Sequence, residues 1–195
     1  MSLRSIVGGI KINRMKRHLE PKALAFPESV QKTSNILICL PAGLRELTLV
    51  KQFLPQIKEV FRPAQITLLS LPGIRVNDIY PRKGFQILCP SADQVTWSGL
   101  PKKSYLETLA GYKFDLVLDM NLSPSPFTRG ILLGQPQAVR VGRGNYLGEP
   151  FYNLEIKTKY LRDERNIYRS LLNMLTIIKR GPADTQPDLN THPTS

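Results

Sequence analysis

The fold is decided by residues 114–156, FDLVLDMNLSPSPFTRGILLGQPQAVRVGRGNYLGEPFYNLEI. The stretch opens with an apolar run that ends on Asp119, which is typical of a strand buried on both faces of a parallel sheet. Residues 126–134 predict a short helix with proline in its first turn and glycine at its end. Residues 137–141 predict a second strand. A strand, a helix and a strand in this order favour a parallel sheet with right-handed crossovers.

The flanking sequence continues this alternation of strands and helices. Residues 35–40, NILICL, form another short apolar run before Pro41, and residues 44–61 have apolar side chains at helical spacing, interrupted by Pro55. Further strands are predicted at 65–71, 85–89 and 94–97, and further helices at 104–111 and 163–180. The predicted fold class is therefore α/β: a single Rossmann-like domain with a mostly parallel sheet and flanking helices.

The chain of 195 residues is long enough for one domain with extensions. We predict a basic N-terminal extension and linker at 1–34, the Rossmann-like domain at 35–181, and a disordered, polar tail at 182–195. Gly8 and Gly9 weaken any helix near the N-terminus. Residues 1–20 are therefore expected to lie outside the core and to serve docking or localisation.

The net charge of +12 is concentrated near the two ends of the chain. Residues 1–34 hold seven Lys and Arg against two acidic residues, and residues 140–180 hold nine against four. Such a surplus favours an anionic partner. The partner could be a protein assembly, an acidic membrane surface or a phosphorylated ligand, with nucleic acid as an alternative, and the charge does not choose among them.

Cysteine usage and the absence of long apolar runs bear on location. Cys39 and Cys89 lie in apolar runs, where buried free thiols are expected, and a reducing cytoplasm fits them. No run approaches the ~20 apolar residues that span a bilayer. A cytoplasmic protein is predicted, with a peripheral position at the inner membrane as an alternative. No sequence motif indicates a metal or a cofactor, and we predict neither.

Several motifs, in order, resemble the N-terminal domain of the family 9 glycosyltransferases, the heptosyltransferases of bacterial lipopolysaccharide synthesis. The similarity extends from about residue 35 to residue 180. It rests on a strand and turn at 36–46, a strand at 66–69, the run 114–119, Arg140-Val141-Gly142, and the aromatic run 151–154.

The resemblance implies a catalytic role for one turn. In this family a first Rossmann-like domain supplies the acceptor side and an aspartate implicated as the base, and a second domain binds most of the nucleotide-sugar donor. Here Arg45-Glu46 stands where the family has Gly-Asp, so Glu46 is the candidate catalytic residue. Its extra methylene moves the oxygens by roughly an ångström, which can cost ~100-fold in rate. An acidic residue that stabilises a helix N-terminus is the alternative for Glu46.

Ligands of parallel α/β sheets lie beyond the carboxyl ends of the strands. The candidate ligand-binding residues there are Gly43, Arg45, Asp119, Arg140, Arg143 and Gly144. Guanidinium groups and open glycine backbone suit an anion at 140–148. A solvated loop is the alternative for this segment, and a turn-forming role is the alternative for Asp119.

These observations favour a non-catalytic binding or scaffold protein, a pseudoenzyme derived from the first half of a family 9 glycosyltransferase, because only that half is recognised. Whether it is an enzyme is left open. The alternatives are a heptosyltransferase-like subunit in cell-envelope polysaccharide synthesis and a basic accessory protein of a nucleic-acid or membrane-bound assembly.

Overall fold

The computed structural model describes residues 3–17, 19, 24–80 and 83–181. Its centre is a six-stranded sheet in which every pair of neighbouring strands is parallel. The strand order is β3-β2-β1-β4-β5-β6, with β1 at Asn35–Cys39, β2 at Gln65–Leu69, β3 at Gln86–Leu88, β4 at Leu116–Asp119, β5 at Val139–Arg143 and β6 at Leu154–Ile156. The order reverses between β1 and β4. The predicted α/β, Rossmann-like fold is confirmed.

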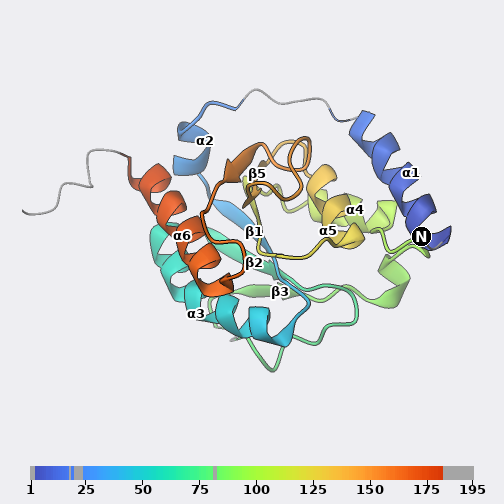
Figure 1. Cartoon of the computed structure of the whole chain (residues 1–195), viewed down its shortest axis with the longest axis horizontal. Helices are drawn as coiled ribbons and strands as arrows, with labels where there is room; N and C mark the ends of the chain where they lie inside the picture. Colours follow the sequence, from blue (N-terminus) through green and yellow to red (C-terminus); the bar gives the residue numbers. More distant parts are fainter. Residues whose placement is uncertain (1–2, 18, 20–23, 81–82, 182–195) are drawn as a thin grey trace, which may run out of the picture.

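Helices cover both faces of the sheet (Figure 1). The α-helices are α1 at Leu3–Arg17, α2 at Glu28–Gln31, α3 at Leu44–Val60, α4 at Lys103–Ala110, α5 at Pro126–Leu133 and α6 at Glu164–Arg180. Helices α2, α3 and α6 share one apolar cluster, and α1, α4 and α5 share the other. The two clusters are separated by the sheet.

Strand β1 shows why the sequence makes a sheet with two buried faces. Ile36 and Ile38 belong to the cluster of α3 and α6, whereas Leu37 and Cys39 belong to the cluster of α5. Successive side chains of a strand point to opposite faces. All four are at most 2% exposed, so an uninterrupted apolar run is what this position requires.

Three local predictions differ from the structure. Helix α3 continues through Pro55 to Val60. The strand predicted at 94–97 is absent from the described residues, where a short 3₁₀ helix at Ala92–Gln94 and an isolated bridge between Val95 and Pro101 are found instead. Strand β6 was not predicted, because its three residues follow an aromatic run without a clear alternation.

The prediction that residues 1–20 lie outside the core is wrong for the described part of that segment. Helix α1 runs through Gly8 and Gly9, and it packs on α5. Gly8 is buried against the Ser98 carbonyl, and Ile12 is 7% exposed within the apolar cluster. Close packing at a glycine outweighs its low helix propensity here.

The end of the predicted extension and linker, residues 28–34, also contributes to the core. Val30 of α2 is completely buried beside α6, and the Gln31 side chain donates to the Ile178 carbonyl at 3.2 Å. The tail predicted to be disordered, 182–195, lies outside the described residues. Among the described helices, none is both long and apolar enough to cross a bilayer.

Candidate functional site

A pocket of about 400 Å³ lies at the carboxyl ends of β1 and β4, where the strand order reverses. This is the position at which open parallel sheets bind ligands. We call it the strand-end pocket, and its lining residues are Ala42, Gly43, Arg45, Glu46, Leu71, Asn121, Ser123, Pro124, Ser125 and Glu164. Three of the predicted site residues, Gly43, Arg45 and Glu46, meet here.

Glu46 lies in the first turn of α3 and bends back over the turn that precedes it. Gly43 is the N-cap of the helix, and its backbone N–H favours the charged form of the nearby Glu46 carboxylate. A Cβ at position 43 would lie 3.3 Å from Glu46 Oε2. A carboxylate in the first turn of a helix is stabilised by the helix dipole. The carboxylate thus has a structural partner within the pocket wall.

The charges around Glu46 are close together. Arg45 Nε lies 2.9 Å from Glu164 Oε2, so the guanidinium is paired with a carboxylate of α6. Burial raises the pKa of Glu46, Glu164 raises it further, and the Gly43 N–H opposes the rise. The strand-end pocket therefore contains two carboxylates and one arginine that is already paired.

Asp119, the last residue of β4, lies behind the pocket wall and is buried. Its Oδ1 accepts from the backbone N–H of Asn121 at 3.0 Å and from the Asn121 side-chain amide at 2.7 Å. Asn121 lines the pocket, so Asp119 orients a pocket residue and is not itself part of the lining. Burial raises the pKa of Asp119, and its hydrogen bonds from Tyr152 and Asn121 oppose that rise.

Tyr152 is the residue of this region that sequence reasoning undervalued. Its hydroxyl donates to Asp119 Oδ2 at 2.6 Å, and its ring lies directly over Gly142. Burial raises the pKa of Tyr152, and the neighbouring Asp119 raises it further. The sequence signal for this contact was a bulky aromatic run that follows a strand containing an isolated glycine, where a neighbouring group can approach the backbone closely.

Arg140, a candidate ligand-binding residue, is buried in the structure. Arg140 is 4% exposed, and its guanidinium donates to three backbone carbonyls, those of Phe151 at 2.9 Å, Gln135 at 3.1 Å and Pro150 at 3.1 Å. It ties β5 to the segment that leads into β6. An arginine surrounded by carbonyl acceptors is not available to hold an anion.

The neighbouring residues of the predicted anion loop also have structural partners. The Gly144 N–H donates to the Ile156 carbonyl at 2.8 Å, and a Cβ at Gly144 would meet Lys157 at 2.9 Å. Arg143 is partly exposed and lies over the Tyr146 ring at 5.3 Å. The structure thus leaves Arg143 as the one cation of the predicted loop with access to solvent.

Within the described residues, no group of His, Cys, Asp and Glu side chains is arranged to hold a metal ion. Cys39 is buried as predicted, and burial together with Asp119 raises the pKa of its thiol. The prediction of a buried thiol is wrong for Cys89, which is exposed.

Comparisons with known proteins agree with the architecture. No protein-family model matches the chain, and no curated protein sequence matches it. The solved structure of the E. coli heptosyltransferase WaaC with ADP is similar, with a TM-score of 0.50 and 14% sequence identity. The similarity covers 72% of this chain and 46% of that one, so the chain spans about half the length of the structure it matches. At this identity the likeness shows the Rossmann-like fold alone.

Proposed function

We propose that this chain is a non-catalytic binding module, built on the first half of a family 9-type glycosyltransferase, and that its strand-end pocket takes a neutral, hydroxyl-rich ligand such as a sugar. The observation that carries the proposal is the set of polar groups in the pocket: the Asn121 amide, the Ser123 and Ser125 hydroxyls and the two carboxylates Glu46 and Glu164. Carboxylates accept hydrogen bonds, and hydroxyls both donate and accept. Sugar hydroxyls complement such a set.

The same groups argue against a nucleotide diphosphate in this pocket. Phosphate recognition uses unpaired guanidinium groups, ammonium groups or open backbone N–H groups. Arg45 Nε is instead paired with Glu164, and the Glu46 carboxylate lies beside the Gly43 backbone. The carboxylate charge left over would repel a diphosphate. The pocket therefore fits the acceptor side of a sugar-transfer reaction better than the donor side.

The position of the Glu46 side chain supports the absence of catalysis. A base must reach the proton that it abstracts, and the Glu46 side chain is folded onto its own helix N-terminus. The resemblance to family 9 turns points the same way, since Arg45-Glu46 replaces the Gly-Asp of that family.

One observation favours a second candidate, a heptosyltransferase-like transferase of cell-envelope polysaccharide synthesis with Glu46 as its base. Burial and Glu164 raise the pKa of Glu46, and a carboxylate base works best when its pKa approaches the operating pH. In that case Glu46 would leave Gly43 and accept a proton from an acceptor hydroxyl.

Turnover separates the two candidates. The full chain is incubated with ADP-heptose and a panel of sugar acceptors, alone and with a protein that carries a donor-binding domain. We expect no transferred sugar and no difference between the wild type and Glu46→Gln. Sugar transfer by the wild type would establish the transferase instead, provided that Glu46→Gln abolishes it and that Glu59→Gln, at the exposed end of α3, leaves it intact.

A further inference from the structure

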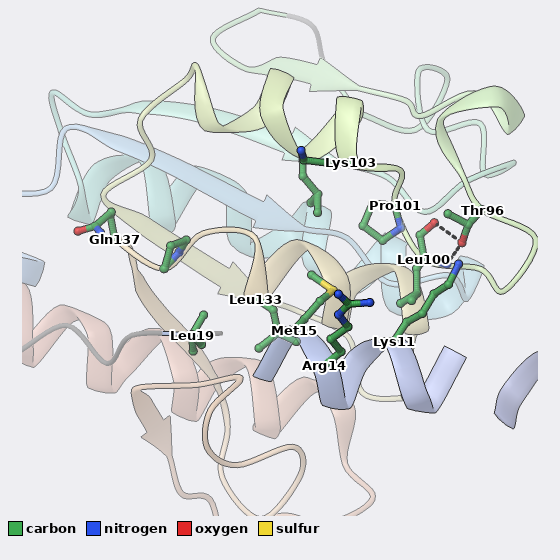
Figure 2. Close-up of a pocket in the computed structure, with 12 residues that line it drawn as sticks. Lys11, Arg14, Met15, Leu19, Thr96, Leu100, Pro101, Lys103, Leu133 and Gln137 are labelled. Carbon is green, nitrogen blue, oxygen red and sulfur yellow. Dashed lines mark hydrogen bonds between the residues drawn. The ribbon is translucent and has the colours of Figure 1, made fainter. Parts of the chain in front are cut away.

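A cavity lies between α1, α4 and α5, on the face of the sheet that these helices cover. It has a volume of about 820 Å³, within the range of sites that bind small organic molecules. Figure 2 shows Lys11, Arg14 and Met15 of α1 on one side of this groove and Lys103 of α4 on the other. Leu100, Leu106 and Leu133 contribute apolar surface. We call it the α1–α4 groove.

The charged residues that line the α1–α4 groove are all cations: Lys11, Arg14 and Lys103. Lys11 and Arg14 are exposed, and neither belongs to an ion pair of the described residues. Lys103 pairs with Glu107 at 3.5 Å in an exposed contact, which holds it weakly. An apolar groove with a cationic rim complements an amphiphile that has an anionic head.

The outward face of α1 is apolar at its N-terminal end. Leu3, Ile6 and Ile10 are 69%, 47% and 64% exposed, at spacings of three and four residues that place them on one side of the helix. They lie opposite Gly8 and Ile12, which face the core. The sequence of α1 contains five Lys and Arg and no acidic residue. Exposed aliphatic side chains can enter a membrane interface while neighbouring cations meet anionic headgroups.

Trp97 extends this surface beyond α1. It is 63% exposed, and it lines a hollow together with Arg4 of α1. Tryptophan is enriched at membrane–water interfaces, where its ring sits at the level of the headgroups. The surface thus combines aliphatic anchors, an interfacial aromatic residue and cations for phosphate groups.

We propose that this side of the molecule docks on a bilayer that contains anionic phospholipid. Leu3, Ile6, Ile10 and Trp97 enter the interface, the cations of the groove rim hold a lipid phosphate, and the apolar floor of the α1–α4 groove receives part of an acyl chain. Nucleic acid fits this surface less well, because the aliphatic stripe and the groove floor would stay exposed to water beside its phosphates. The proposal is independent of the strand-end pocket and of its ligand.

Trp97 makes the test direct, since it is the single tryptophan of the chain. The full chain is mixed at about 0.15 M salt with vesicles of phosphatidylglycerol and phosphatidylcholine, or of phosphatidylcholine alone. We expect co-sedimentation with the anionic vesicles at least ~10-fold stronger than with neutral ones, with a blue shift of the Trp97 emission and loss of binding as salt rises. Equal binding to neutral vesicles, or an unshifted emission, contradicts the proposal.

Paired variants separate the parts of the surface. Lys11→Glu with Arg14→Glu should weaken vesicle binding by more than ~10-fold, because each basic residue near an anionic surface contributes to affinity. Ile6→Ser with Ile10→Ser should remove the blue shift. The matched control, Lys51→Glu with Arg62→Glu, makes the same charge change at exposed positions on and beyond α3, and it should bind like the wild type. Thermal unfolding verifies that each variant is folded.

Two further binding experiments test other ligands of the same surface. Dodecyl phosphate below its micellar concentration probes the groove without a bilayer, and poly(U) probes RNA. Membrane docking would be overturned if the wild-type chain bound dodecyl phosphate or poly(U) but not anionic vesicles, and if Lys11→Glu with Arg14→Glu abolished that binding. The surface would then be assigned to a free amphiphile or to RNA.

Discussion

The hydroxyl of Tyr152 donates a 2.6 Å hydrogen bond to Oδ2 of Asp119, and both residues are almost fully buried. This contact ties the segment after β5 to the carboxyl end of β4. Asp119 in turn positions Asn121 at the wall of the strand-end pocket. The pocket is therefore held from behind by residues that a ligand does not touch.

Tyr152→Phe should lower the free energy of unfolding by about 1–3 kcal/mol, because it leaves a buried carboxylate without one of its donors. Urea unfolding at neutral pH measures the effect. Tyr160→Phe, at a half-buried tyrosine whose ring lies beside Lys159, serves as the control and should change stability by less than about 0.5 kcal/mol. Equal stability of Tyr152→Phe and the wild type would mean that the contact is not formed in solution.

Asp119→Asn tests the direction in which folding shifts the pKa of Asp119. Burial raises the pKa of Asp119 in the folded state, so the folded protein holds this proton more tightly than the unfolded chain. Stability contributed by this proton is then present at low pH and is lost as the pH rises from about 4 through the folded pKa. The stability of Asp119→Asn relative to the wild type should therefore increase between about pH 4 and pH 7. A relative stability that falls over this range would show that the hydrogen bonds outweigh burial.

Gly142→Ala should destabilise the fold by about 1–3 kcal/mol through overpacking. A Cβ at this position would meet the Tyr152 ring at 2.2 Å, and the ring is fixed at its far end by Asp119. Gly9→Ala is the matched control, since nothing lies within 4 Å of its Cβ position in α1. That change should instead stabilise by about 0.5–1 kcal/mol through helix propensity. Thermal unfolding of both variants checks that Gly142→Ala lowers stability and that Gly9→Ala raises it.

Arg140→Met should cost about 2–4 kcal/mol in the free energy of unfolding, because three buried backbone carbonyls lose their donors. Arg143→Met, at the partly exposed position three residues later, should stay within about 0.5 kcal/mol of the wild type. If the two variants unfold alike, Arg140 is not the tie between β5 and the following segment.

Much of the architecture could be predicted from local patterns. Continuous apolar runs such as those of β1 and β4 are short and bounded by turns, and they determine the parallel sheet. The acidic residues at the start of α6 and the basic residues at its end fixed the limits of that helix. The first turn of α3 could also be placed beside the strand ends, and two of its residues line the pocket together with the N-cap Gly43.

The rest depended on contacts between distant segments. Arg140 resembles a surface cation in the sequence, and its burial follows from carbonyls supplied by residues 135, 150 and 151. Helix α1 contains two adjacent glycines; the packing of Gly8 against Ser98 explains why the first is tolerated, whereas nothing lies near the Cβ position of Gly9. Neither kind of contact leaves a periodic signal in the sequence.

Amide chemical-shift mapping of the isotope-labelled full chain tests the central claim most directly. The chain is titrated separately with neutral hexoses and heptoses and with ADP. We predict that at least one neutral sugar shifts the amides of Gly43, Glu46, Asn121 and Ser123 around the strand-end pocket, and that ADP leaves these amides in place. ADP that shifts the strand-end amides while every neutral sugar leaves them unmoved would contradict the account.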